Sequence, residues 1–154
     1  MTSEPFAIET EGHFTPKVFL LADAADYKSY ATVMETTTAM VAKKPDLVQR
    51  MVDATIEGWY GYLYGDPTPA NTVIKQENPD MSDDQIAYSY AKMKEHGIVD
   101  SGDAKTLGIG AMTDARWQAF FESAAAVGLY PKGLDYKKAY TLQFVNKKHG
   151  MEGP

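Results

Sequence analysis

Three side chains near the start of the chain have types and spacing suited to holding a small organic molecule. They lie in the segment Asp23-Ala-Ala-Asp-Tyr27-Lys-Ser-Tyr30. Asp23 follows an apolar run that suits a strand, and α/β folds place their ligand-contacting loops just beyond strand ends. Tyr27 and Tyr30 each offer a flat ring face and a hydroxyl, which suit a conjugated or polar ligand. The alternative is that both tyrosines pack half-buried under a loop and only stabilise it.

Glu4 and Pro5 form a second candidate. In Ser3-Glu4-Pro5-Phe6-Ala7-Ile8 a carboxylate, a proline and an aromatic residue stand together at the very first residues. No strand or helix is predicted before them, so the stretch is typical of the end of an element whose beginning lies outside this sequence. Glu4 supplies a carboxylate that can accept hydrogen bonds, but the residues alone do not place it in a ligand site. The alternative is a solvated carboxylate at the terminus.

Little in the sequence supports metal, covalent or nucleotide chemistry. His13, His96 and His149 are far apart and lack the spacing of a metal site, which favours three surface histidines. The absence of cysteine excludes disulfides, thiolate metal sites and cysteine nucleophiles. No nucleophile elbow or phosphate-binding loop occurs, and Gly108-Ile109-Gly110 lacks the third glycine of a dinucleotide fingerprint. We predict no metal, no cofactor and no catalytic residue.

Two groups of aromatic residues are predicted to be core rather than ligand contacts. The first comprises Trp59, Tyr60, Tyr62 and Tyr64, and the second comprises Trp117, Phe120 and Phe121. Both groups recur at helical spacing, and an aromatic stripe of that kind is more often core than cleft.

Two short strands are predicted, both early in the chain. Lys17–Leu21 is a continuous apolar run whose length and lack of alternation suit a strand buried on both faces. Residues Tyr30 to Glu35 are rich in β-branched and aromatic types and form the second strand. Because two strands do not make a stable sheet, we expect them to complete a sheet whose other strands lie elsewhere. The predicted fold class is therefore α/β, mostly helical, with few strands.

The rest of the chain is predicted to be helical or loop. Thr36 to Lys43 turns helical before Pro45 interrupts it, and a long helix with one apolar stripe (Val48, Met51, Val52, Thr55, Trp59, Tyr62) then runs from Pro45 to Gly65. Three shorter helices follow: one capped by Thr68, one from the capping box at Ser82 and Gln85 to Gly97, and one from Thr113 to Gly128. Ser101 to Gly110 is predicted to be a loop, and Asp135 to begin a last helix through Val145.

Charge and hydropathy exclude two classes of partner. The net charge of −6 argues against nucleic acid, because such surfaces need clustered Lys and Arg. No run of about 18 apolar residues occurs, so no segment is expected to cross a membrane. The N-terminus lacks the basic-then-apolar pattern of a secretory signal, and we interpret Met1 as the start of a truncated chain or of a shortened reading frame.

The order of five motifs resembles one protein family. These are Ser3 to Ile8, Asp23 to Tyr30, Pro45 to Arg50, Gly58-Trp59-Tyr60 and Thr106 to Trp117. Together they resemble the C-terminal half of periplasmic solute-binding proteins of the nitrate/sulfonate/taurine/thiamine-pyrimidine type, the receptor subunits of ABC importers. The resemblance runs from about Thr2 to Asn146 but covers only about half of a family member.

The resemblance implies a partial type II periplasmic-binding-protein fold and a non-enzymatic role. Family members are two-lobed α/β proteins that close on a small solute and deliver it to a membrane permease. Residues 1–31 would form a hinge and cleft segment, and residues 32–154 a helical part that packs on the first lobe, as one incomplete domain. Glu4 would accept hydrogen bonds from ligand amines, Pro5 would stiffen the crossover between lobes, and Asp23, Tyr27 and Tyr30 would lie near the cleft.

The ligand and the alternatives follow from the same resemblance. The lack of basic residues beside the candidate site speaks against a sulfonate or nitrate, whereas Glu4 and the aromatic residues favour an aminopyrimidine thiamine precursor. Because one wall of the cleft is missing, we expect weak binding by the chain alone, and a homodimer, with strands exchanged, is a further hypothesis. A stand-alone dimerising protein derived from a receptor half is the alternative. A thiamine-pyrimidine synthase is disfavoured because its cysteine-rich motif is absent.

Overall fold

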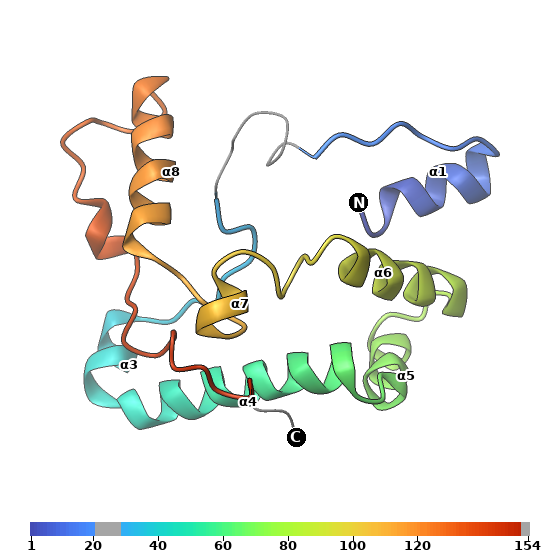
Figure 1. Ribbon diagram of the computed structural model, residues 1–154, viewed down its shortest axis with the longest axis horizontal. Helices are drawn as coiled ribbons and strands as arrows, with labels where there is room; N and C mark the ends of the chain where they lie inside the picture. The colour runs from blue at the N-terminus through green and yellow to red at the C-terminus, as the bar shows by residue number, and fades with distance from the viewer. Residues whose placement is uncertain (21–28, 152–154) are drawn as a thin grey trace.

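The computed structural model describes residues 1–20 and 29–151, and every regular element in that part of the chain is a helix (Figure 1). In chain order the elements are α1 (Glu4–Gly12), α3 (Thr38–Lys43), α4 (Pro45–Tyr64), α5 (Thr68–Glu77), α6 (Asp83–Glu95), α7 (Ala104–Leu107), α8 (Asp114–Ala126) and the 3₁₀ helix η1 (Tyr136–Ala139).

The α/β prediction is therefore wrong. No strand forms in residues 1–20 or 29–151, and a periplasmic-binding-protein fold, even a partial one, conflicts with this all-helical chain. In the first expected strand, Val18 and Phe19 are exposed rather than buried on two faces. Residues 30–35, the second expected strand, are irregular. The run is apolar, but a strand needs hydrogen-bonding neighbours, and the described part of the chain supplies none.

The N-terminal segment also differs from the prediction. Glu4 and Pro5 do not follow an element but begin one, since Pro5 occupies the first turn of α1, where its missing N–H costs nothing. This helix packs against α6, where the ring centroids of Phe6 and Tyr88 are 5.4 Å apart. The Ser89 hydroxyl also donates to the carbonyl of Thr2, just before α1, at 2.6 Å. Figure 1 shows the two helices side by side.

Helix α4 carries the core on one of its faces. Val52, Ile56 and Leu63 are buried, and they pack against Ile109 from the loop after α7 and Phe144 from the C-terminal segment. The predicted apolar stripe merged two different faces, because Met51 is 58% exposed while its neighbour Val52 is buried. Pro45 opens the helix and Asp46 lies in its first turn, as expected for a positive helix terminus.

Capping chemistry sets the start of α6 and the end of α8 as predicted. The Ser82 hydroxyl accepts the Gln85 amide at 3.1 Å at the start of α6. At the end of α8, Gly128 has φ +78° and the amide of Leu129 donates to the Ala124 carbonyl at 2.9 Å, which completes a Schellman motif.

Three other predictions differ from the structure. Thr68 is the first residue of α5 and not its cap. The predicted loop from Ser101 to Gly110 contains the short helix α7, and the expected last helix is reduced to η1.

A serine pair tests the capping assignment. Ser82→Ala removes the acceptor at the start of α6 and is expected to destabilise the protein by about 1 kcal/mol in urea unfolding. Ser123 is exposed inside α8, and Ser123→Ala is expected to change the free energy of unfolding by less than about 0.5 kcal/mol. If the two substitutions changed the free energy of unfolding equally, the Ser82 cap would not be what stabilises α6.

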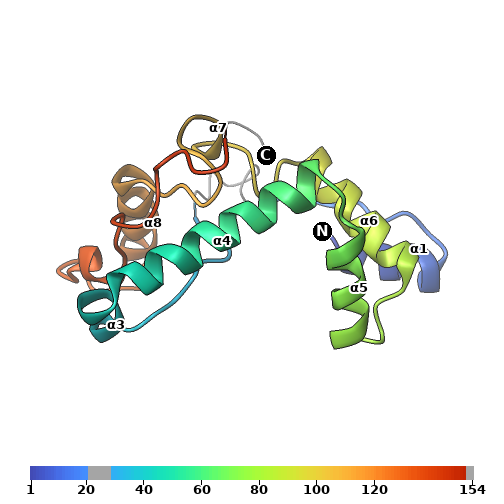
Figure 2. The same cartoon turned by 90° about the horizontal axis from the view of Figure 1, so that it is seen from below.

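The helices bury little surface against one another. The chain exposes 10792 Å² to solvent, whereas a compact monomer of 17.0 kDa exposes roughly 7,700 Å². In Figure 2, α4 forms a long central element with α7 and the C-terminal segment on one side, while α5 runs away from its C-terminal end on the other. Much apolar surface therefore stays uncovered.

Candidate functional site

A cluster of three aromatic rings and one arginine lies where residues 29–30 meet the start of α8. The ring cluster, as we define it, consists of Tyr30, Trp117 and Tyr140 together with Arg116. The Trp117 and Tyr140 rings stack with centroids 4.8 Å apart and planes within 6°. Tyr30 is tilted against Trp117 at 5.6 Å, and the Arg116 guanidinium lies 4.4 Å above the Tyr30 ring. Stacked rings with a cation on one face form a platform for flat, polarisable molecules.

Backbone contacts fix the position of the ring cluster. Thr113 caps α8, as predicted, because its hydroxyl accepts the Arg116 amide at 3.3 Å. The Thr113 amide donates to the Tyr30 hydroxyl at 2.8 Å, and Arg116 Nη2 donates to the Ser29 carbonyl at 2.6 Å. Tyr30 is thus tied to the first turn of α8 through both its hydroxyl and its ring.

The same region is anchored to the C-terminal segment by Asn146. Its side chain accepts the amide of Met112 at 3.1 Å and donates to the Met112 carbonyl at 2.7 Å. This two-way contact between the Asn146 side chain and the Met112 backbone fixes the residues before α8 to the C-terminal segment.

Two hydrogen-bond donors of the ring cluster have no acceptor. Arg116 Nε and Trp117 Nε1 are buried and lack a partner within the described residues. A buried donor without a hydrogen-bond acceptor costs about 1–3 kcal/mol, and a ligand that supplies the acceptor would recover part of that cost. These two atoms are the clearest chemical reason to regard the ring cluster as a candidate binding site.

A carboxylate holds the third ring. Tyr140 donates its phenolic hydrogen to Asp114, and this hydrogen bond raises the pKa of Tyr140 from 10.0 to about 12. Tyr64 makes the equivalent bond to Asp100, and its pKa is likewise raised to about 12. Because the folded pKa exceeds the unfolded value, the stabilisation is complete below pH 10 and is lost as the pH rises towards 12.

These two pairs predict a selective change in tyrosine titration. Asp114→Asn removes the charged acceptor of Tyr140 and is expected to lower the pKa of that phenol towards 10 while Tyr64 stays near 12. Asp100→Asn is the matched variant and should act on Tyr64 alone. Ultraviolet difference absorbance of the phenolate measures both. A titration curve unchanged in the two variants would contradict the assignment.

The structure separates the predicted site residues. Tyr30 lies in the ring cluster, whereas Glu4 and Pro5 belong to α1, and no recorded contact joins them to Tyr30. Glu4 is 77% exposed, and its pKa is lowered by its own backbone amide, by Ser3 and by the N-terminal ammonium, which lies 3.2 Å away. Asp23 and Tyr27 fall outside the described residues. The solvated-carboxylate alternative therefore describes Glu4.

The sequence did not point to most of the ring cluster. Arg116 and Tyr140 were not singled out, and Trp117 was assigned to a core. No motif links Tyr140 to Trp117, because their stacking depends on how the chain after η1 folds back along α8. One signal for Arg116 was present in the sequence: it lies three residues after the predicted cap Thr113, and so in the first turn of the helix next to Tyr30.

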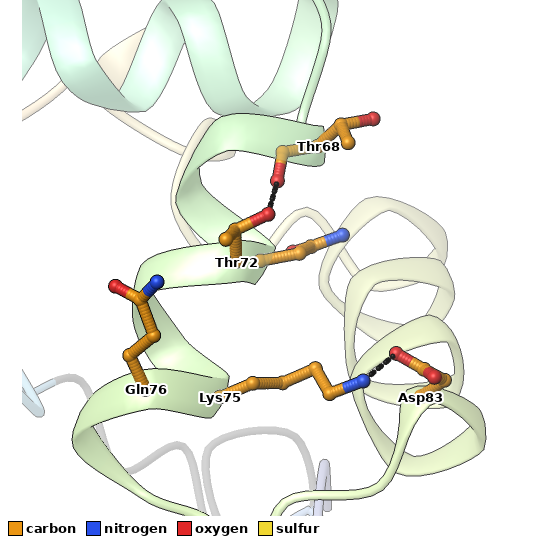
Figure 3. A pocket seen from close by; sticks show the side chains of 6 residues that line it. Thr68, Thr72, Lys75, Gln76 and Asp83 are labelled. Carbon is orange, nitrogen blue, oxygen red and sulfur yellow. Dashed lines mark hydrogen bonds and ion pairs between the residues drawn. The ribbon is translucent and has the colours of Figure 1, made fainter.

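A polar pocket of about 410 Å³ lies between α5 and α6 but has little of a binding site's chemistry. It is lined by Thr68, Asn71, Thr72, Lys75, Gln76 and Asp83. Figure 3 shows Lys75 reaching across to Asp83, with which it forms an ion pair of 2.8 Å. Both side chains are exposed, so the pair contributes about 0–1 kcal/mol and the cationic group is already satisfied.

The described residues form neither a metal site nor a membrane-spanning helix. Within residues 1–20 and 29–151 no three His, Asp or Glu side chains gather closely enough to hold a metal ion. No helix in the same ranges combines the length and apolarity needed to cross a membrane, which agrees with the prediction for that part of the chain.

Comparison with known proteins adds no further constraint. No family model, no curated protein and no solved structure matches this chain. Functional assignment therefore depends on the residues themselves and on the geometry of the ring cluster.

Proposed function

We propose that this chain is a solute-binding component of an ABC importer, or a part of one, and that its solute is a flat nitrogen heterocycle such as an aminopyrimidine thiamine precursor. The order of the five sequence motifs supports the receptor class. The ring cluster supports the type of solute, and the observation that carries the proposal is its pair of buried, unpartnered donors, Arg116 Nε and Trp117 Nε1.

The chemistry of the ring cluster suits an aromatic acceptor. Ring nitrogens of a pyrimidine accept hydrogen bonds in the plane of the ring. Arg116 Nε and Trp117 Nε1 can donate to them only when the rings part, because both atoms are buried. Exocyclic amines need carboxylate acceptors, which Asp114 and Asp103 offer: Asp114 binds Tyr140, and Asp103 accepts from Thr113 at 3.3 Å. A sulfonate or nitrate would meet these two carboxylates as like charges.

Affinity is expected to be low for the chain alone. The rings of Trp117 and Tyr140 already stack on each other, so a solute must add to the edge of the stack or part it. We expect a Kd on the order of 1 mM, which corresponds to about −4 kcal/mol. In the receptor role the chain would work in the periplasm with a permease as its partner.

Tryptophan fluorescence tests the proposal at the atoms that carry it. The chain has two tryptophans, so Trp59→Phe leaves Trp117 as the sole reporter. Titration with a 4-aminopyrimidine is expected to quench that emission with saturation in the millimolar range. Trp117→Phe keeps an aromatic ring but removes the unpartnered N–H, and calorimetric titration should show about tenfold weaker binding.

Controls make the result specific. Taurine, a sulfonate, is expected to leave the emission of the Trp59→Phe variant unchanged. Trp117→Phe compared with Trp59→Phe separates loss of the donor from a general effect of losing an indole. A Trp117 signal that ignores the aminopyrimidine throughout the millimolar range would end the proposal.

The second candidate function is an interaction protein that works through its own surface. The specific observation in its favour is the exposed area, which exceeds that of a compact monomer by about 3,000 Å². Thermal unfolding separates the two functions: a solute raises the melting temperature as its concentration rises, whereas a purely structural dimer responds only to protein concentration.

A further inference from the structure

An apolar pocket of about 290 Å³ lies in the angle between α4 and α5, and two of its lining residues, Trp59 and Tyr62, also pack against the core. It is lined by Thr55, Gly58, Trp59 and Tyr62 of α4, Ala70 and Ile74 of α5, and Met93 of α6. In Figure 2 this angle opens on the side of α4 opposite to α7 and the C-terminal segment. Gly58 deepens the pocket, since a Cβ at that position would meet no atom within 4 Å.

The pocket continues an apolar stripe along α4. Its members are Leu47, Met51, Thr55, Gly58 and Tyr62, which follow one another at spacings of four, four, three and four residues and so share one face. Leu47 is 43% exposed and Met51 is 58% exposed, although both are large apolar side chains. The buried residues Val52, Ile56 and Leu63 occupy a different face of the same helix.

The stripe is complementary to itself. Leu47 and Met51 protrude on one side of Thr55, about 12 and 6 Å away along the helix axis, and the pocket at Gly58 and Tyr62 lies about 4.5 and 10.5 Å away on the other. An antiparallel pairing of two α4 helices about an axis beside Thr55 therefore sets Met51 of one copy against Gly58 of the other. We propose that this face of α4 is the interface of a two-fold symmetric homodimer.

Side-chain chemistry supports the same pairing. Met51 would meet the Trp59 ring beside Gly58, and methionine sulfur contacts aromatic rings favourably. On the polar flank of the stripe, the Arg50 side chain has no hydrogen bond or ion pair within residues 1–20 and 29–151. The Glu57 carboxylate is 65% exposed and already contacts His149 Nε2 at 2.8 Å, so its free oxygen is the one left for a second partner. The antiparallel arrangement brings Arg50 of each copy near Glu57 of the other, which makes two symmetric ion pairs.

The area available is sufficient. A specific interface buries about 800 Å² on each partner. The chain's exposure exceeds that of a compact monomer by about 3,000 Å² over its whole surface, which leaves room for an interface of this size without itself locating it on α4. This interface lies on α4 and α5, not on the ring cluster, and it stands or falls independently of solute binding.

Sedimentation equilibrium of the full chain tests the dimer. We expect a mass of about 34 kDa, twice the 17.0 kDa of one chain, at micromolar concentration. Met51→Lys places a charge opposite the pocket and is expected to raise the dissociation constant at least about 30-fold. Val127→Lys is the matched control, because Val127 is 82% exposed at the end of α8, and it should leave the mass unchanged.

A filled pocket gives a second, independent variant. Gly58→Leu adds a side chain into open space and should strengthen α4, so helicity measured by circular dichroism is expected to rise while the dimer dissociates. Arg50→Glu should weaken the dimer, and the double variant Arg50→Glu with Glu57→Arg should restore it, as a direct contact between these two residues across the interface predicts.

A cysteine reports the axis directly. Because the native chain has no cysteine, Thr55→Cys introduces a single thiol that is expected to form a disulfide-linked dimer on mild oxidation, whereas Val127→Cys should not. A monomer at high micromolar concentration overturns the proposal. A dimer that survives both Met51→Lys and Gly58→Leu also overturns it. So does a chain that stays monomeric alone and uses this face of α4 only to bind a different protein.

Discussion

Phe144→Ala is expected to lower the free energy of unfolding by about 3–5 kcal/mol, because it deletes a large side chain from a very small core. Phe144 is 6% exposed and packs with Ile56 and Leu63 of α4. Its carbonyl also accepts the Gln49 side-chain amide at 3.1 Å, so the residue joins the C-terminal segment to α4 through its ring and its backbone. A marginally stable chain has roughly 5 kcal/mol in total, and this one substitution removes most of it.

Phe14→Ala is the matched control for this prediction. Phe14 is 61% exposed, so the same chemical change there is expected to cost less than about 0.5 kcal/mol. Urea unfolding followed by circular dichroism measures both. If the two variants unfold at the same urea concentration, the C-terminal segment does not form part of the core, and the cluster around α4 is not what stabilises the protein.

Helices were predictable because their signals are local. Pro45, the Ser82 cap and the Gly128 ending act within one or two turns, and each sets the boundary that the sequence indicated. Strands were not, because the run around Val18 and Phe19 is a strand only if neighbours exist to pair with it. An apolar run without such neighbours is simply exposed, and the pattern alone cannot tell these cases apart.

The site was predictable only in part, for a related reason. Tyr30 was chosen for the chemistry of its ring and hydroxyl, and both are engaged by the first turn of α8. The proximity of Tyr30 to Tyr140 depends on a long-range fold that no local spacing encodes. Glu4 was chosen through the resemblance, which implied a cleft, and it lies instead in an exposed helical turn.

Gly108→Ala is expected to destabilise the protein by about 3 kcal/mol, and the reason is backbone geometry rather than lost packing. Gly108 has φ +96° and ψ 161°, a region that only glycine adopts readily and that costs other residues about 1–3 kcal/mol. A Cβ there would also lie 3.2 Å from the Cα of Lys148, a backbone atom that cannot move aside cheaply. The Lys148 amide donates to the Leu107 carbonyl at 3.1 Å, and this contact should break.

The control for Gly108 is Gly133→Ala. Nothing lies within 4 Å of a Cβ at Gly133, so alanine there is expected to be neutral or to stabilise by up to about 1 kcal/mol. Gly108 and Phe144 secure the same C-terminal segment, one through its backbone and the other through its ring. Once one of these two contacts is lost, the C-terminal segment is already held less firmly, so losing the other contact costs less stability. The double variant should therefore lose less free energy of unfolding than the two single losses added together. Strict additivity in urea unfolding would instead mean that the two residues stabilise separate parts of the chain.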